Sequence, residues 1–218
     1  TISVSSGEKF DWGGGGYTSV QGGEGNDTIE SWAYARYGAL NNATGGDGND
    51  VLTITASGVE DVRNVAYGDG GADTLQLSVS AGGFGGSAEG SNEAYGGDGN
   101  DIVVATIELT TGGDDGGNEI LPNGGLNLVY GDDGNDRLSA SIIVDDASEL
   151  GLARSELYGG TGDDRLKVSG GDENFLTGNQ GNDTLLGSTG DDRMIGGQGD
   201  DYLKGYAGDD TFEFQSAR

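Results

Sequence analysis

Cysteine and histidine are both absent from the 218 residues of this chain. Without cysteine there can be no disulfide bonds and no thiol chemistry, and without both residues the usual zinc ligand sets are excluded. Almost all catalytic triads are excluded as well, because they need a histidine base. No apolar run approaches the length of a membrane-spanning helix. The fold must therefore be stabilised by something other than disulfide bonds or zinc.

Basic residues are scarce. Ten Lys and Arg stand against 38 Asp and Glu, which gives a formal net charge of −28. A nucleic-acid-binding surface needs the opposite sign, so a nucleic-acid partner is excluded. Repulsion on this scale destabilises any compact state unless cations are bound. The charge therefore indicates a protein that binds cations.

Apolar residues make up only 33 % of the chain, which does not suit an ordinary globular core. Glycine, at 47 residues, is about three times as frequent as in average proteins. The chain begins at Thr1 without Met and ends at Arg218, so we interpret it as a monomeric fragment of a longer protein.

A short phrase recurs along the whole chain, as in YGGDGND (95–101), YGDDGND (130–136) and YGGTGDD (158–164). Ten such phrases end at Asp27, Asp50, Asp73, Asp101, Asp136, Asp164, Asp183, Asp192, Asp201 and Asp210. The steps between these Asp are 23, 23, 28, 35, 28, 19, 9, 9 and 9 residues. A fixed phrase with variable spacers indicates stacked coils whose loops differ in length. The last steps of nine fit a coil that carries two phrases.

Period-two patterns flank each phrase. After Asp50, for example, Leu52, Ile54 and Ala56 share one face, which predicts a strand with one buried side. A second short strand is expected before each phrase. Its inward apolar residues are Val20, Ala43, Ala66, Ala94, Val129, Leu157 and Leu176.

Two residues before these apolar positions lies a file of amides. Its members are Asn41, Asn64, Asn92, Asn127 and Asn174, with Thr18 and Ser155 in the remaining coils. Alternation points these side chains inward, where an unpaired amide is costly. Stacked coils would let each amide donate to the next, so the pattern predicts an internal Asn ladder in a parallel β-solenoid.

The phrase itself suits a hard cation. Glycine tolerates positive φ, so its carbonyls can turn toward one point, and the final Asp adds a carboxylate. Such an all-oxygen set matches Ca²⁺, which takes six to eight oxygens. One phrase supplies too few oxygens but two stacked phrases supply enough. We therefore expect each ion to lie between successive coils.

GGDGNDVLT (45–53) and GGQGDDYLK (196–204) resemble the GGxGxDxUx nonapeptide of RTX proteins, a known Ca²⁺-binding repeat. The resemblance covers nearly all of residues 20–212. It implies an all-β, right-handed parallel β-roll (a β-solenoid) with Ca²⁺ ions stacked between coils. It also implies a bacterial, extracellular protein that is exported by type I secretion and folds outside the cell. DTFEF (210–214) resembles the motif that closes many RTX blocks.

The resemblance also implies the metal ligands, which are the ten Asp named above and the oxygens of the phrase loops. One site would combine Gly46, Gly48 and Asp50 with Gly68, Gly70 and Asp73. The further loop positions are Gly23, Gly25, Gly45, Asp47, Asp69, Gly71, Gly96, Gly97, Asp98, Gly99, Gly131, Asp132, Asp133, Gly134, Gly159, Gly160, Thr161, Gly162, Gly178, Asn179, Gln180, Gly181, Gly190, Gly196, Gln198, Gly205 and Ala207.

Of the ten phrase-ending Asp, we expect Asp192 and Asp210 to begin a second column on the opposite side. The remaining eight are expected to form one column. Such columns would hold about eight Ca²⁺ ions. Only the end of the chain has the 18-residue turns of RTX rolls. The predicted organisation is therefore an N-terminal cap with first strands (1–19), a wide-coil solenoid (20–186) and a tandem nonapeptide end (187–218). The number of strands on the second side of the wide coils stays open.

Other features have competing interpretations. Tyr67, Tyr95, Tyr130 and Tyr158 form either a structural aromatic ladder, which we favour, or a sugar-stacking platform. A file of outward-facing hydroxyl side chains consists of Thr55, Ser78, Thr106, Ser141 and Ser169. We interpret it as ordinary strand surface rather than as an ice- or glycan-binding surface. Phe10, Trp12, Trp32 and Tyr34 are expected to cap the open end.

We expect no enzyme activity. Acidic residues abound, but no carboxylate pair outside the repeat suggests sugar hydrolysis. The predicted function is Ca²⁺-dependent folding and rigidity of an extracellular bacterial protein. The alternatives are a glycan-binding or adhesin module, with extracellular polysaccharide as partner, and a polysaccharide lyase or epimerase.

Overall fold

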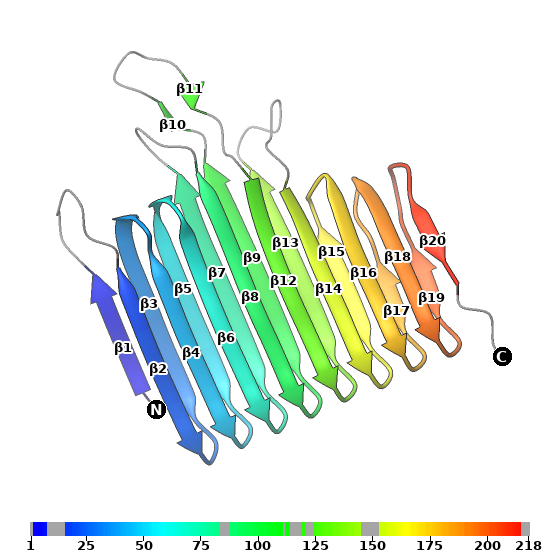
Figure 1. Ribbon diagram of the computed structural model, residues 1–218, viewed down its shortest axis with the longest axis horizontal. Coiled ribbons are helices and arrows are strands. Elements are labelled where there is room, and N and C mark those ends of the chain that lie inside the picture. Colours follow the sequence, from blue (N-terminus) through cyan, green and yellow to red (C-terminus); the bar gives the residue numbers. More distant parts are fainter. Residues whose placement is uncertain are drawn as a thin grey trace.

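The computed structural model describes residues 2–7, 16–82, 88–110, 112–113, 119–120, 124–144 and 153–214. In this part of the chain every regular element is a β-strand, and none is a helix that could cross a membrane. The strands form two nine-stranded parallel sheets and one short antiparallel pair. Figure 1 shows the two large sheets lying one over the other. The prediction of an all-β parallel solenoid is therefore confirmed.

The first sheet, here called sheet A, contains odd-numbered strands alone. Its strands, in spatial order, are β1 (Ile2–Gly7), β3 (Thr28–Tyr37), β5 (Val51–Glu60), β7 (Thr74–Gly82), β9 (Ile102–Thr110), β13 (Arg137–Val144), β15 (Arg165–Ser169), β17 (Thr184–Leu186) and β19 (Tyr202–Lys204).

The second sheet, sheet B, holds the strands that precede the phrases. In spatial order they are β2 (Tyr17–Glu24), β4 (Leu40–Asp47), β6 (Val62–Gly70), β8 (Glu89–Asp98), β12 (Gly124–Asp133), β14 (Ala153–Thr161), β16 (Glu173–Gln180), β18 (Asp191–Gln198) and β20 (Thr211–Glu213).

From β2 onward, each coil consists of a sheet B strand, a phrase loop, a sheet A strand and a second turn. Eight of the ten phrase loops lie along the lower edge in Figure 1, and the second turns, which include the phrases of Asp192 and Asp210, lie along the upper edge. Each strand pairs in parallel with the equivalent strand of the next coil, so that Leu52 pairs with Leu75 and Leu75 with Val103. This unbroken register brings every phrase directly beside the next.

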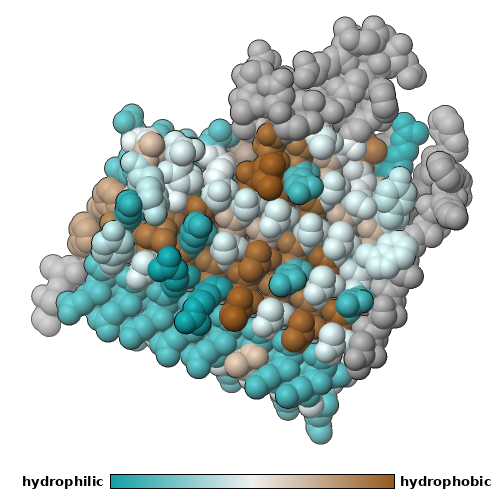
Figure 2. Space-filling view, turned by 180° about the vertical axis from the view of Figure 1, so that it is seen from behind, coloured by the Kyte–Doolittle hydropathy of each residue, from teal (hydrophilic) through white to brown (hydrophobic). Residues whose placement is uncertain are grey.

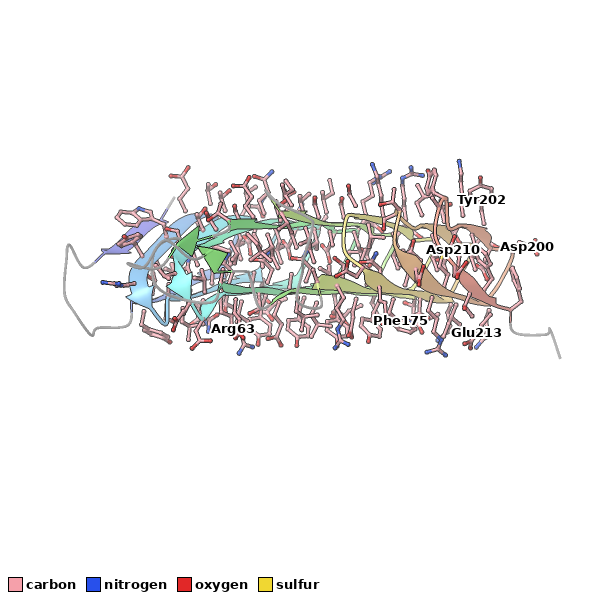
Figure 3. The ribbon with its side chains drawn as sticks, turned by 90° about the horizontal axis from the view of Figure 1, so that it is seen from above. Arg63, Phe175, Asp200, Tyr202, Asp210 and Glu213 are labelled. Carbon is pink, nitrogen blue, oxygen red and sulfur yellow. The ribbon has the colours of Figure 1, made fainter. Side chains whose placement is uncertain are left out.

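The core is a thin layer of aliphatic side chains between the sheets. All seven predicted inward residues of sheet B are buried, as are the alternate residues of the sheet A strands such as Leu52, Ile54 and Leu75. Burying one face of each strand explains the period-two pattern. Figure 3 shows the two layers from above, with Phe175 and Glu213 projecting from sheet B and Tyr202 from sheet A.

The wide coils have one strand on each side, which answers the question of strand count. Their extra residues lie in longer strands and in the connections from a sheet A strand to the next sheet B strand. One of these connections contains the antiparallel pair β10 (Gly112–Gly113) and β11 (Glu119–Ile120). The division into three regions stays a prediction.

The predicted Asn ladder is confirmed for Asn64, Asn92 and Asn127, whereas Asn41 bonds Ser31 and the Thr55 carbonyl instead of the next Asn. Asn64 Nδ2 donates to Asn92 Oδ1 at 3.0 Å, and Asn92 Nδ2 donates to Asn127 Oδ1 at 3.0 Å. The same amide nitrogens donate to backbone carbonyls of sheet A, at Ser78 (2.7 Å) and Thr106 (2.9 Å). All five Asn are buried. The ladder therefore links successive coils and also links the two sheets.

The outer face of sheet B carries the predicted Tyr file. Successive rings of Tyr67, Tyr95, Tyr130 and Tyr158 stack with centroids 4.7 to 4.9 Å apart and nearly parallel planes. Each ring face covers its neighbour, so the inner rings offer edges rather than faces to a ligand. The geometry supports the structural ladder over the sugar platform.

The outer face of sheet A, seen in Figure 2, mixes hydrophobic and polar side chains. Thr55, Ser78 and Thr106 pair in register here, as the hydroxyl file predicts. The expected end cap is wrong for Trp32 and Tyr34, which are 48 % and 49 % exposed on this outer face. Strand alternation points them away from the core. Phe10 and Trp12 lie outside the described residues.

Candidate metal centre

The phrase loops stack so that their final Asp side chains form a continuous column. The Asp27 backbone N–H donates to Asp50 Oδ1 at 2.6 Å, and Asp50 N–H donates to Asp73 Oδ1 at 2.7 Å. The same bond repeats through Asp101, Asp136, Asp164, Asp183 and Asp201. A second, shorter column lies at the opposite edge, where Asp192 N–H donates to Asp210 Oδ1 at 3.1 Å.

The second oxygen of each inner carboxylate has no protein partner. The Oδ2 atoms of Asp50, Asp73, Asp101, Asp136, Asp164 and Asp183 are buried without a hydrogen bond. An unsatisfied buried carboxylate oxygen is expensive, and native proteins pair such atoms with a donor or a metal ion. These six atoms therefore indicate a place for a cation in the gaps between coils.

A backbone oxygen of the next coil approaches each of these carboxylates. A Cβ atom at Gly45 would lie close to Asp50 Oδ2 and 2.9 Å from the Gly68 carbonyl oxygen. Each gap of the first column repeats this arrangement, and Gly187, Asp192 and the Gly205 carbonyl repeat it in the second column. Oxygens from two coils thus converge beside the first glycine of each phrase, which matches the oxygen preference of Ca²⁺.

Positive φ angles turn the phrase loop. In the second coil, Gly46 has φ 107° and Gly48 has φ 135°. The first of these positions also accepts Asp69, Asp132 and Asn179, at φ 72° to 74°. Asp and Asn tolerate this region better than other side chains because they are short and polar. The sequence pattern therefore allows these substitutions without a change of backbone.

Burial without a partner ion makes the carboxyl groups hard to ionise. Desolvation raises the pKa of Asp101 and Asp136 to about 6 and the pKa of Asp164 to about 7, while the backbone N–H bond lowers each in part. Desolvation likewise raises the pKa of Asp73 and Asp183 to about 6. A cation in the gap would offset this penalty on the charged form. In the absence of metal, protons compete for the same oxygens.

The other acidic loop residues lie on the outside. The side chains of Asp47, Asp69, Asp98, Asp132 and Asp133 are exposed, unlike the buried carboxylates of the inner phrase-ending Asp. In the described part of the chain, no three Asp or Glu come close enough to hold a metal ion by side chains alone. Each site would therefore need backbone carbonyls as well as the phrase-ending Asp.

The remaining predicted loop residues follow the same plan. Gly70, Thr161, Gln180, Gln198 and Ala207 occupy the third position of their phrases, at the outer turn of each loop. The first-position glycines of two phrases, Gly22 and Gly187, were not among the predicted site residues, although the structure places them like Gly45. Alignment of the phrases on their final Asp would have identified both.

Sequence reasoning also missed an outer relay at the fifth phrase position. Asn49 N–H donates to Asn26 Oδ1 at 2.9 Å, and Asn135 N–H donates to Asn100 Oδ1 at 2.7 Å. These bonds run from each coil back to the preceding one, opposite to those of the Asp column. The signal in the sequence is the recurring Asn before the final Asp. The two relays together fix the spacing of neighbouring loops.

Two glycines of one phrase provide a matched test of this geometry. A Cβ at Gly68 would overlap the Gly96 carbonyl oxygen and lie 2.5 Å from Asp73 Oδ2, whereas a Cβ at Gly70 meets only Asp47 Oδ1 at 3.6 Å. We expect Gly68→Ala to lose calcium binding at this gap and to lower the melting temperature. Gly70→Ala should behave like the unaltered chain. Equal melting temperatures and equal calcium contents in the two variants would contradict the crowded gap.

Comparison with known proteins gives one match. The family model of the RTX calcium-binding nonapeptide repeat matches four stretches of the chain, residues 12–33, 88–106, 156–185 and 177–212. No curated protein and no solved structure matches the chain. The matched stretches include five of the eight first-column Asp and both Asp of the second column.

Proposed function

We propose that calcium ions between its coils fold and stiffen this chain, which carries four copies of the RTX calcium-binding nonapeptide repeat. The observation that carries the proposal is the set of six buried Oδ2 atoms without a hydrogen bond. They lie at one position in successive coils, facing the carbonyl of the next phrase. Removing a cation from such a site would leave like charges stacked in a low-dielectric layer.

We propose about eight ions. The first column has seven gaps between its eight phrases, and the second column has one gap between the phrases of Asp192 and Asp210. Each inner carboxylate faces two gaps, because its Oδ1 is bonded to the coil before it and its Oδ2 approaches the coil after it. Bound calcium would supply charge neutralisation and a bridge between coils, while the chain provides the oxygens and their spacing.

The proposed extracellular location rests on the affinity that is typical of extracellular calcium modules. Extracellular calcium modules bind in the range of about 10⁻⁴ to 10⁻³ M, which suits calcium outside a cell but not inside. A chain with a charge of −28 that depends on such ions would remain unfolded before export and fold after it. We therefore propose an extracellular role in a bacterial protein, reached by type I secretion. We assign no catalytic residue to the chain.

The test is a count of bound ions. The chain, freed of metal and dialysed against about 1 mM Ca²⁺, should bind about eight ions per molecule by mass spectrometry of the metal content. Magnesium at the same concentration should replace few of them, because it demands a smaller octahedral site and keeps its waters. A folded chain that binds no calcium would refute the proposal.

A further inference from the structure

One file of side chains runs through the inside of sheet B from the Asn ladder into the second Asp column. Asn41 pairs with Asn64, Asn64 with Asn92 and Asn92 with Asn127 in the strand register. Further along the sheet, Asn174 pairs with Asp192, and Asp192 is bonded to Asp210. The amide ladder and the second carboxylate column are therefore two parts of the same file. Asn174 is the last amide and Asp192 is the first carboxylate.

Oxygen atoms surround the amide nitrogen of Asn174. Its two hydrogens can reach three acceptors, Asp192 Oδ1 at 2.8 Å, Ser188 Oγ at 3.1 Å and the Gly170 carbonyl oxygen at 3.2 Å. The side chain is buried, and its own oxygen accepts the Ser155 N–H at 3.0 Å. A nitrogen with three oxygen neighbours, one of them a carboxylate, resembles the surroundings of a cation.

Asp192 differs from the inner carboxylates of the first column because both of its oxygens are hydrogen-bonded. Oδ1 accepts from the Asn174 amide, and Oδ2 accepts from the Ser188 N–H at 2.6 Å. In the first column, the inner Asp instead have a buried Oδ2 without a partner. Asn174 itself accepts an N–H of the preceding coil through Oδ1, as a first-column Asp does, so its Nδ2 takes the place of the Oδ2 that those Asp leave without a partner. This Nδ2 bonds the carboxylate of the next coil directly.

The loop before Asn174 otherwise resembles a phrase. Gly170 and Gly171 have φ of 73° and 81°, and a Cβ at Gly190 would lie 2.5 Å from the carbonyl oxygens of Gly171 and Asp172. The loops of the two coils are therefore in close contact at this edge, as they are along the first column. What the loop lacks is a carboxylate in the final position.

We propose that Asn174 closes the second calcium column, its amide taking the place of an ion between its coil and the coil of Asp192. The inference rests on the proposed calcium function and adds which residue sets the number of ions. With an amide, the gap needs no cation. With a carboxylate, the same gap would bring Asp192 and a second acid together around the oxygens of Gly170 and Ser188, and would need one.

The test is the substitution Asn174→Asp. The variant should bind one more Ca²⁺ per chain than the unaltered protein, counted by metal analysis at saturating calcium. Its melting temperature should depend more steeply on calcium, because one more acid must be neutralised. The matched control is Asn127→Asp, a rung bonded to Ser155 rather than to a carboxylate, which should bind no additional ion.

The unaltered protein offers a second measurement that does not depend on how the variant folds. A crystal grown with Tb³⁺ in place of calcium should show anomalous scattering in the gap between Asp192 and Asp210 and none between Asn174 and Asp192. An ion beside Asn174, or a folded Asn174→Asp variant with an unchanged ion count, would overturn the inference. An unaltered chain that binds no calcium at all would instead defeat the proposed function, and this inference with it.

Discussion

Removal of calcium should abolish most of the β-sheet circular dichroism of this chain. The core between the sheets is thin and aliphatic, and the strands bury too little apolar surface to offset the ordering of 47 glycines. The stacked carboxylates add repulsion that only a bound cation relieves. In excess EGTA we therefore expect a largely unfolded chain, and on addition of calcium a cooperative return of the sheet signal.

The size of the effect can be estimated from typical affinities. With a Kd near 10⁻⁴ M and about 1 mM Ca²⁺, each site adds RT ln(1 + 10), or about 1.4 kcal/mol. Seven or eight independent sites then add roughly 10 kcal/mol, as much as the whole stability of a typical domain. At submicromolar calcium the same sites add almost nothing. Because each ion needs two ordered coils, the transition should be steeper than for independent sites.

The measurement is far-ultraviolet circular dichroism during a calcium titration in metal-depleted buffer.

Lowering the pH should restore part of the folded structure in the absence of metal. Five carboxyl groups have pKa values of about 6 to 7 in the fold, above the ordinary value of 3.8, so their protonated forms stabilise the metal-free fold at low pH. They are Asp73, Asp101, Asp136, Asp164 and Asp183. That stability is lost as the pH rises through 6 to 7. A full sheet spectrum in EGTA at pH 8, unchanged by 10 mM Ca²⁺, would show that metal only decorates a stable fold.

Loss of one inner carboxylate should cost two ions. Asp101 Oδ1 accepts the Asp73 N–H at 2.7 Å, and a Cβ at Gly96 would approach both Asp101 Oδ2 and the Gly131 carbonyl. Asp101→Ala therefore removes a ligand from the gaps on both sides and leaves a buried N–H without its acceptor. Asp210, in contrast, bonds one described coil, so Asp210→Ala should cost one ion. The loss of stability should be larger for Asp101→Ala, by about 1.4 kcal/mol for the additional ion.

Asp98→Ala is the matched control, because this acid lies in the same phrase as Asp101 with its side chain exposed on the outside. Its backbone oxygen remains available, so the ion count should not change. Calorimetric titration and metal analysis of the three variants should give losses of two, one and no ions. Equal losses for Asp101→Ala and Asp210→Ala would show that the sites are not shared between coils.

The repeat made much of this architecture predictable from the sequence. The period-two pattern around Asp50 and the file of inward Asn followed from strand alternation, because both report which side of a strand is buried. The paired strands of the wide coils could not be counted, since the long second turns interrupt the pattern. The end cap was wrongly predicted for Trp32 and Tyr34, because large aromatic residues near one end of a solenoid suggest a cap. In the strand they alternate with the buried Ser31 and Ala33 and therefore point outward.

The candidate site, like the fold, could be predicted from the sequence only in part. The spacing of the phrases identified the Asp column, but not the bond of each Asp to the coil before it, which depends on how far one coil lies from the next. The substitution of an amide for an ion at Asn174 was hidden, because that residue belongs to the Asn file by spacing and to the second Asp column by position.

The two edges of the solenoid differ in how well they tolerate inserted residues. On the edge of the phrase loops, one inserted residue would shift a carboxylate that two gaps share, along with the relays on either side of it. On the opposite edge, the additional pair β10 and β11 lies between β9 and β12 in the sequence, and β9 still pairs with β13 and β8 with β12 in register (Figure 1). Lengthening a connection there costs mainly loop-closure entropy, which grows only slowly with length. That edge is therefore where an inserted peptide or a whole domain could be displayed along the rod.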